Sequence, residues 1–259
     1  MLKGELKNRI LVLDGGLGTS FQRLKLAEKD YHSPALDKKL PLGEGEKPLK
    51  GNHEILNITS PEKVAQVHRD YLEAGADIIE TNTFGANRLV QEEYGIGPEV
   101  VVEMCREGAR IALEAARAYS AEKPRFVAGS VGPTSKSISL GAEENFEEFV
   151  TAYTEQIGAL VDAGVDIVLI ETVFDTLNCR AALLGFEGVL ESRGIRREEG
   201  PALWISVSLS DKSGRTLSGQ SPSAFWTSIA HSSPLMYFSL KLLIPKTQII
   251  TVSLLKIWL

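Results

Sequence analysis

The chain has 259 residues, of which 43% are hydrophobic and 24% are charged, and its formal net charge is −6. This length suits a single α/β domain, and the negative charge argues against nucleic acid or an anionic membrane as a partner. Two cysteines are too few for a disulfide framework, and the charged N-terminal residues lack the apolar core of a signal peptide. We therefore expect a cytoplasmic protein that acts on a small molecule.

Five short apolar segments predict buried β-strands, at residues 10–13, 77–80, 125–129, 166–171 and 203–209. The segments between them have helical periodicity. One helix is expected to start at Pro61 with Ser60 as its cap, and its apolar face would carry Val64, Val67, Tyr71 and Leu72. The stretches EAGADIIET and DAGVDIVLIET repeat one helix–glycine–strand unit. Such alternation predicts a (β/α)8 barrel or a doubly wound sheet, and periodicity alone does not choose between them.

Polar residues follow these strands, at the ends where parallel α/β proteins place their sites. The polar ends read DGGLGT (14–19), ETNTF (80–84), GSVGPT (129–134) and ETVFDT (171–176). Three of the ends carry a carboxylate directly after the strand, from Asp14, Glu80 and Glu171. A carboxylate in that place is costly to desolvate unless it faces a cation or a hydrogen-bond donor. Such groups suit an ammonium ion, which favours an amino-acid substrate over a phosphorylated one.

These features also have structural interpretations. Glu80 or Glu171 could pair with an arginine at the sheet rim, namely Arg88, Arg125 or Arg180. The glycine loop 15–19 could bring backbone N–H groups close to an anion, or it could simply turn the chain into a helix. Its spacing matches neither the dinucleotide fingerprint nor a P-loop.

The sequence offers no zinc site. Cys105 and Cys179 fall in helical segments and are interpreted as buried structural thiols. The four histidines, His32, His53, His68 and His231, lack metal-ligand spacing.

Several long motifs, in order, resemble the homocysteine S-methyltransferase family, and within it the N-terminal homocysteine-binding module of cobalamin-dependent methionine synthases. They are DGGLGT, LKGNHEILNIT, SPEKVAQVHRDYLEAGADIIETNTF, AGSVGPT, IETVFDTLN and SDKSGRTLSGQ, and the match covers residues 8 to about 231. The resemblance implies a (β/α)8 TIM barrel that transfers a methyl group to the sulfur of homocysteine and so makes methionine. The donor it implies is methylcobalamin, recharged from methyltetrahydrofolate by cobalamin- and folate-binding modules of the full-length enzyme.

The resemblance also implies roles for individual residues. The loop from Asp14 through Gly15, Gly16 and Gly18 to Thr19 would hold the homocysteine carboxylate through backbone N–H groups. Glu171 would accept the ammonium group. The remaining residues would line, shape or support the same pocket, and they are Glu80, Thr81, Asn82, Gly132, Pro133 and Asp175. In the family, zinc held by cysteines after the sixth and later strands activates the thiol.

The chain departs from the family pattern near residue 232. The zinc-binding motifs Gly-x-Asn-Cys and Gly-Gly-Cys-Cys do not occur, all 34 acidic residues lie at or before Asp211, and no glycine follows Gly219. We therefore expect residues 1–231 to be the front of the barrel and residues 232–259 to be an aberrant, frameshift-like tail, cut by Lys241, Pro245 and Lys246 into pieces too short to span a membrane.

Only five of eight βα units are recognisable, so we expect an unpaired strand edge, poor solubility and no turnover. The alternatives are a betaine- or S-methylmethionine-dependent homocysteine methyltransferase and a non-catalytic truncated binding module.

Overall fold

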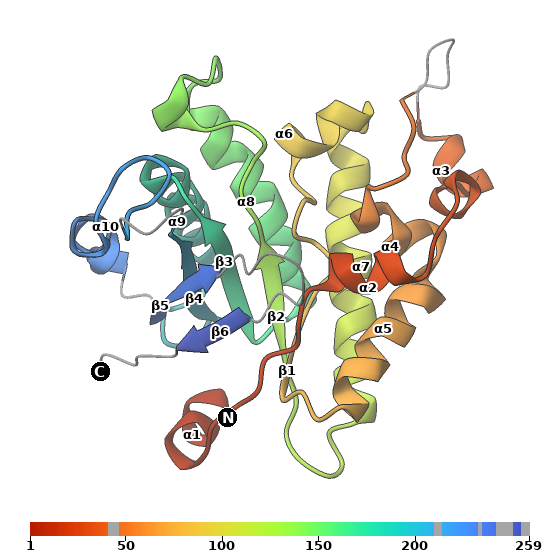
Figure 1. The fold of residues 1–259 in the computed structure, drawn as a ribbon, viewed down its shortest axis with the longest axis horizontal. Coiled ribbons are helices and arrows are strands. Elements are labelled where there is room, and N and C mark those ends of the chain that lie inside the picture. Colours follow the sequence, from red (N-terminus) through yellow and green to blue (C-terminus); the bar gives the residue numbers. More distant parts are fainter. Residues whose placement is uncertain (41–46, 210–213, 233–234, 242–250, 255–259) are drawn as a thin grey trace.

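A computed structural model describes residues 1–40, 47–209, 214–232, 235–241 and 251–254, with side chains up to residue 232 (Figure 1). Its centre is one six-stranded sheet in the order β1-β2-β3-β4-β5-β6, in which β1 to β5 are parallel and β6 is antiparallel to β5. The strands are β1 Ile78–Glu80, β2 Phe126–Val131, β3 Ile167–Val173, β4 Ala202–Ser208, β5 Leu235–Lys241 and β6 Thr251–Leu254.

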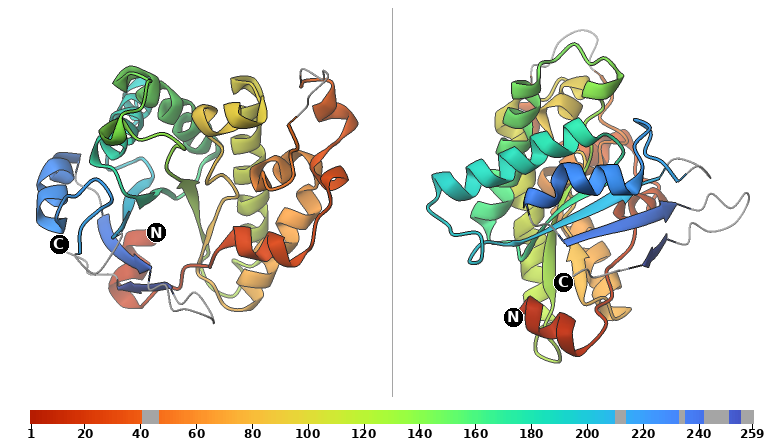
Figure 2. Two further views of the ribbon diagram at one scale, coloured as in Figure 1. Left: turned by 45° about the horizontal axis from the view of Figure 1, so that its top comes forward. Right: turned by 90° about the vertical axis from the view of Figure 1, so that its left-hand side faces the viewer.

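The spatial order of the parallel strands is their chain order, and this decides between the two predicted architectures. A doubly wound sheet reverses its strand order at a switch point, and the described strands contain no reversal. Helices α7, α8 and α9 pack against β2 and β3 and lie along the outside of the curved sheet (Figure 2). The chain therefore has the barrel-type winding, as an incomplete (β/α)8 barrel.

The helix expected to start at Pro61 is present as α5, Pro61–Glu73. The described α-helices are α1 Leu2–Asn8, α2 Leu17–Arg23, α3 Pro34–Asp37, α4 Leu56–Thr59, α5 Pro61–Glu73, α6 Arg88–Gln91, α7 Pro98–Ala118, α8 Phe146–Ala163, α9 Thr176–Ser192 and α10 Pro222–Ile229. In α8, Asn145 and Glu148 form a capping box and Gly164 ends the helix at φ +87°. In α5, Ser60 occupies the cap position, but its hydroxyl donates to the carbonyl of Asp30 rather than capping the helix.

The strand expected at residues 10–13 is wrong in extent. Only Leu13 forms a parallel bridge, with Ile78, although Val12 and Asp14 also share backbone hydrogen bonds with the start of β1. The reason is the lack of cover on this segment, because Ile10 is 89% exposed and Val12 is 55% exposed. The segment still lies in the first-strand position, which brings Asp14 to the carboxyl-terminal edge of the sheet.

The two faces of the sheet are buried by different elements. The outer face packs against the helices in the main hydrophobic core. On the inner face, alternate residues form a smaller apolar cluster that Leu2 of α1 joins, and its strand residues are Ile78, Phe126, Ala128, Ile167, Leu169 and Trp204. The same alternation places Glu80, Ser130 and Glu171 further along the inner face. The inner face is therefore apolar near its base and polar at the carboxyl ends of the strands.

The parallel sheet continues into the segment after residue 231. Strand β5 pairs with β4 along Trp204–Ser208, and helix α10 precedes it. The predicted tail otherwise lies largely outside the described residues, and its assignment stays a prediction. Among the described helices, none is long and apolar enough to cross a membrane.

Candidate functional site

Three carboxylates gather at the carboxyl-terminal edge of the inner face. Asp14 follows the Leu13 bridge, Glu80 ends β1, and Glu171 lies near the end of β3. The backbone N–H of Glu80 donates to Oδ2 of Asp14 at 3.0 Å, which joins the first two strand ends. The buried oxygen Oδ1 of Asp14 has no hydrogen-bond partner among the described residues.

The carboxylates of this cluster repel one another when they are ionised. Burial raises the pKa of Asp14 well above its usual range, and the nearby charge of Glu171 raises it further. The pKa of Glu80 is likewise raised, first by burial and then by the charges of Glu171 and Asp14. Such a cluster gains free energy when it binds either a proton or a cation such as an ammonium group.

Two of the three arginines considered as ion-pair partners for Glu80 or Glu171 bind other groups. Arg88 pairs with Glu155, its Nε lying 2.8 Å from Oε2 of that residue. Arg125 donates to the backbone carbonyls of Ala76 and Tyr119.

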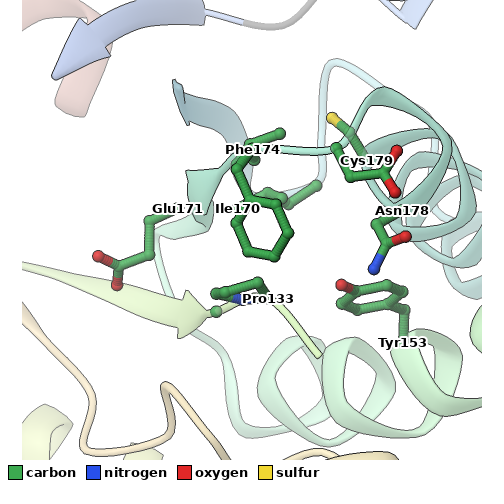
Figure 3. A pocket seen from close by; sticks show the side chains of 10 residues that line it. Pro133, Tyr153, Ile170, Glu171, Phe174, Asn178 and Cys179 are labelled. Carbon is green, nitrogen blue, oxygen red and sulfur yellow. The ribbon is translucent and has the colours of Figure 1, made fainter. Parts of the chain in front are cut away.

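The position of Glu171 depends on an irregularity in β3. Thr172 has a left-handed backbone at φ +56°, and the pairing register with β4 shifts between Ile170 and Val173. β-Bulges next to sites re-aim a side chain, and a non-glycine residue in this region carries strain that the surrounding structure must hold. The Ser130 hydroxyl donates to Oε1 of Glu171 at 2.5 Å, and the carboxylate points away from Tyr153 and Asn178 (Figure 3).

Thr81 and Asn82, expected to line the pocket, are buried just behind Glu80. Oγ1 of Thr81 accepts the backbone N–H of Ser130 at 2.9 Å. The Asn82 amide donates to Oδ1 of Asn57 at 2.9 Å and to the carbonyl of His53 at 2.7 Å. Both side chains thus hold the strand ends and the 53–57 segment in place.

The glycine loop lies at the start of α2 beside the acidic cluster. Gly15, Gly16 and Thr19 are exposed, and the Thr19 hydroxyl donates to the carbonyl of Gly16 at 2.7 Å. A Cβ on Gly15 would lie 3.1 Å from the hydroxyl of Tyr71, so this glycine lets α5 approach the loop.

Gly132, Pro133 and Asp175 line a small hollow between the sheet and helices α8 and α9, and Glu171 lines the same hollow (Figure 3). A Cβ on Gly132 would lie 2.6 Å from the carbonyl oxygen of Phe84, so the strand end tolerates only glycine there.

Asp175 caps α9 and accepts hydrogen bonds from both the backbone and the hydroxyl of Ser139 and from the hydroxyl of Ser137. Burial by itself raises the pKa of Asp175, but these hydrogen bonds outweigh it and the pKa lies below its usual range. The side chain therefore fixes the 137–139 loop.

Two residues beside the site were missed in the sequence. Ser130 shares the inner face with Ala128, so strand alternation carried a usable signal. His53 packs its ring 5.4 Å from that of Phe21, and its Nδ1 lies 3.2 Å from the hydroxyl of Tyr31. His53 lies within the motif LKGNHEILNIT, but the motif gave it no role because its place beside the site depends on the fold.

Zinc does not fit the described residues. Both cysteines are buried in different helices, and burial raises the pKa of Cys179 to about 12 and that of Cys105 further. His32 is held between Glu28 and Asp37, and His68 lies inside the core. Within the described ranges, no group of three histidine, cysteine, aspartate or glutamate side chains could hold a metal ion.

Comparison with known proteins gives one family and one fold. The family model for homocysteine S-methyltransferase matches residues 11–242. The metallated form of the homocysteine methyltransferase MmuM from Escherichia coli superposes with a TM-score of 0.68 at 21% identity, covering 92% of this chain and 77% of that one. Its oxidized form gives 0.69 at 21% identity, covering 92% and 76%.

Proposed function

Because the chain belongs to the homocysteine S-methyltransferase family, we propose that its carboxylate cluster binds the amino-acid end of homocysteine. The convergence of Asp14, Glu80 and Glu171 at one sheet edge is the observation that carries this proposal. An ammonium group has three N–H donors and a positive charge, so it would satisfy the free oxygen of Asp14 and relieve the mutual repulsion.

The other residues take supporting roles in this proposal. The exposed backbone of Gly15 and Gly16, with half-buried Gly18 and exposed Thr19, would receive the substrate carboxylate beside the ammonium site. Thr81 and Asn82 keep Glu80 and the 53–57 segment in register. Gly132 and Pro133 shape the adjacent rim, and Asp175 supports it from below.

In its lineage we assign the chain to the methionine-synthase type, with methylcobalamin as the donor and with cobalamin- and folate-binding modules as partners. The motifs ETVFDTLN and GRTLSGQ support this over the betaine- and S-methylmethionine-dependent types. A donor assay separates these alternatives. Zinc would polarise and deprotonate the thiol in the family, but the residues present do not fit it, so we propose that this chain binds homocysteine without turnover.

The test is calorimetric titration of homocysteine into the Glu171→Gln variant. The substitution keeps the shape and removes the charge, so loss of a charged hydrogen bond of about 1.5–3 kcal/mol should weaken binding by about tenfold or more. Glu191→Gln, at an exposed position of α9, is the matched control and should bind like the unaltered chain. Equal affinities in all three proteins would remove Glu171 from the site.

A further inference from the structure

Zinc in proteins is bound mainly by cysteine sulfur and histidine nitrogen. Both cysteines and all four histidines of the chain lie within the described residues, so each of these possible zinc ligands can be located. Cys105 lies in α7, where its thiol donates to the carbonyl of Ala86 at 3.4 Å. Cys179 lies in α9 and lines the small hollow. Figure 3 places Cys179 and the carboxylate of Glu171 on opposite sides of Phe174. The Cys105 thiol is therefore engaged elsewhere, and Phe174 lies between Cys179 and the carboxylate of Glu171 although both residues line the hollow.

His53 is the histidine tied most directly to the site, through the bond from Asn82 to its backbone carbonyl. One imidazole cannot build the tetrahedral nitrogen and sulfur site that zinc takes. His32 is bound by two carboxylates, His68 is buried without partners for either ring nitrogen, and His231 is exposed in a short helical turn. The thiol end of a bound homocysteine therefore meets no zinc ligand set.

Without a metal ion, the thiol of a bound homocysteine keeps close to its ordinary pKa. An uncoordinated thiol has a pKa near 8.5, so about a tenth of it is ionised at pH 7.5. Among the described residues, no group of histidine, cysteine or carboxylate side chains could hold a metal ion that would lower this pKa. The bound sulfur would stay a neutral thiol, which behaves as a small apolar group with a weak donor.

From these observations we infer that the site recognises the α-amino-acid group of its ligand and does not distinguish a thiol from a methyl group, with or without zinc. The inference rests on the proposed function and deepens it, because it names the ligand class as short apolar α-amino acids. L-norvaline, which carries CH3 where homocysteine carries SH, should bind as well as homocysteine. 4-Mercaptobutyrate, which keeps the thiol and lacks the ammonium group, should not.

The experiment titrates these three compounds into chelator-treated protein at pH 7.5 under reducing conditions. It is repeated with protein equilibrated with zinc chloride and dialysed. We expect homocysteine and norvaline to agree within about threefold, because the volume-conserving exchange of SH for CH3 changes little. Zinc should leave both affinities unchanged, and 4-mercaptobutyrate should bind at least about tenfold more weakly, since it cannot satisfy the carboxylates.

Two results overturn the inference in distinguishable ways. Norvaline binding about tenfold more weakly than homocysteine, or zinc tightening homocysteine about tenfold, would mean that the sulfur is recognised. Either result refutes the inference and leaves the proposed amino-acid site standing. If folded protein binds neither amino acid, or binds 4-mercaptobutyrate as tightly as homocysteine, the proposed function fails together with the inference.

Discussion

The buried imidazole of His68 should make the stability of the protein depend on pH. His68 lies on the core side of α5 with its side chain fully buried, and neither ring nitrogen has a hydrogen-bond partner among the described residues. Burial, with a smaller contribution from the charge of Arg69, lowers the pKa of His68 to about 4. The folded protein therefore holds a neutral ring at pH values where the unfolded chain binds a proton.

The direction and size of the change in unfolding free energy with pH follow from this difference in pKa. In the unfolded chain His68 titrates near 6.5, so its contribution is fully present above that pH and is lost as the pH falls towards 4. The full loss corresponds to about 3 kcal/mol, of which about 2 kcal/mol is already lost at pH 5. Asp14 and Glu80 act in the opposite direction, because their raised pKa values stabilise the fold as the pH falls.

The assay must therefore isolate His68 from these carboxylates. Urea unfolding followed by circular dichroism at pH 7.5 and pH 5.0 gives the change in unfolding free energy for the unaltered chain, for His68→Leu and for the exposed-site control His231→Gln. We expect His68→Leu to lose about 2 kcal/mol less than the other two proteins between these pH values. The same pH dependence in all three proteins would refute the assignment of a neutral, unpartnered ring.

Two further substitutions test the frame around the site. Gly132→Ala should lower the unfolding free energy by about 2 kcal/mol in thermal or urea unfolding, because its Cβ would collide with the carbonyl of Phe84. Gly188→Ala in α9 is the control, since its Cβ meets no atom within 4 Å and the change should be neutral or stabilising. Equal effects of the two substitutions would show that the contact between Gly132 and Phe84 is not tight. Asp175→Ala should lower the unfolding free energy by about 3 kcal/mol, since it removes a helix cap and leaves Ser139 unpartnered. Asp175→Asn should lower the unfolding free energy by only about 1 kcal/mol. Identical losses in the two variants would contradict a role for the acceptor oxygens of Asp175.

Local patterns were enough to predict most of the sheet. The strands expected at 77–80, 125–129, 166–171 and 203–209 agree with β1 to β4 within two residues at each end. These segments are buried on both faces, so their apolar runs are long enough to read without knowledge of their neighbours. The residue pattern did not distinguish a barrel from a doubly wound sheet, because strand order is a property of the whole sheet.

The remaining features depend on contacts between distant segments. Leu13 makes a single bridge because the segment before it is not covered, and cover depends on distant parts of the chain. Strand β5 pairs with β4, and a change of composition near residue 232 obscured it in the sequence. The left-handed backbone of Thr172 belongs to a threonine and carries no glycine signal, so the turn that aims Glu171 was not predictable.

The amino-acid site that we propose is built from contacts between neighbouring strands, and this explains how it could exist apart from a complete barrel. Asp14 is joined to Glu80 across the first pair, Thr81 to Ser130 across the next, and Ser130 to Glu171 across the third. Each contact spans one strand spacing and requires no closure of the sheet. Thiol activation, in contrast, needs several ligands converging on one ion. Amine recognition and thiol activation are therefore physically separable, and the amine site that we propose needs only the first kind of contact.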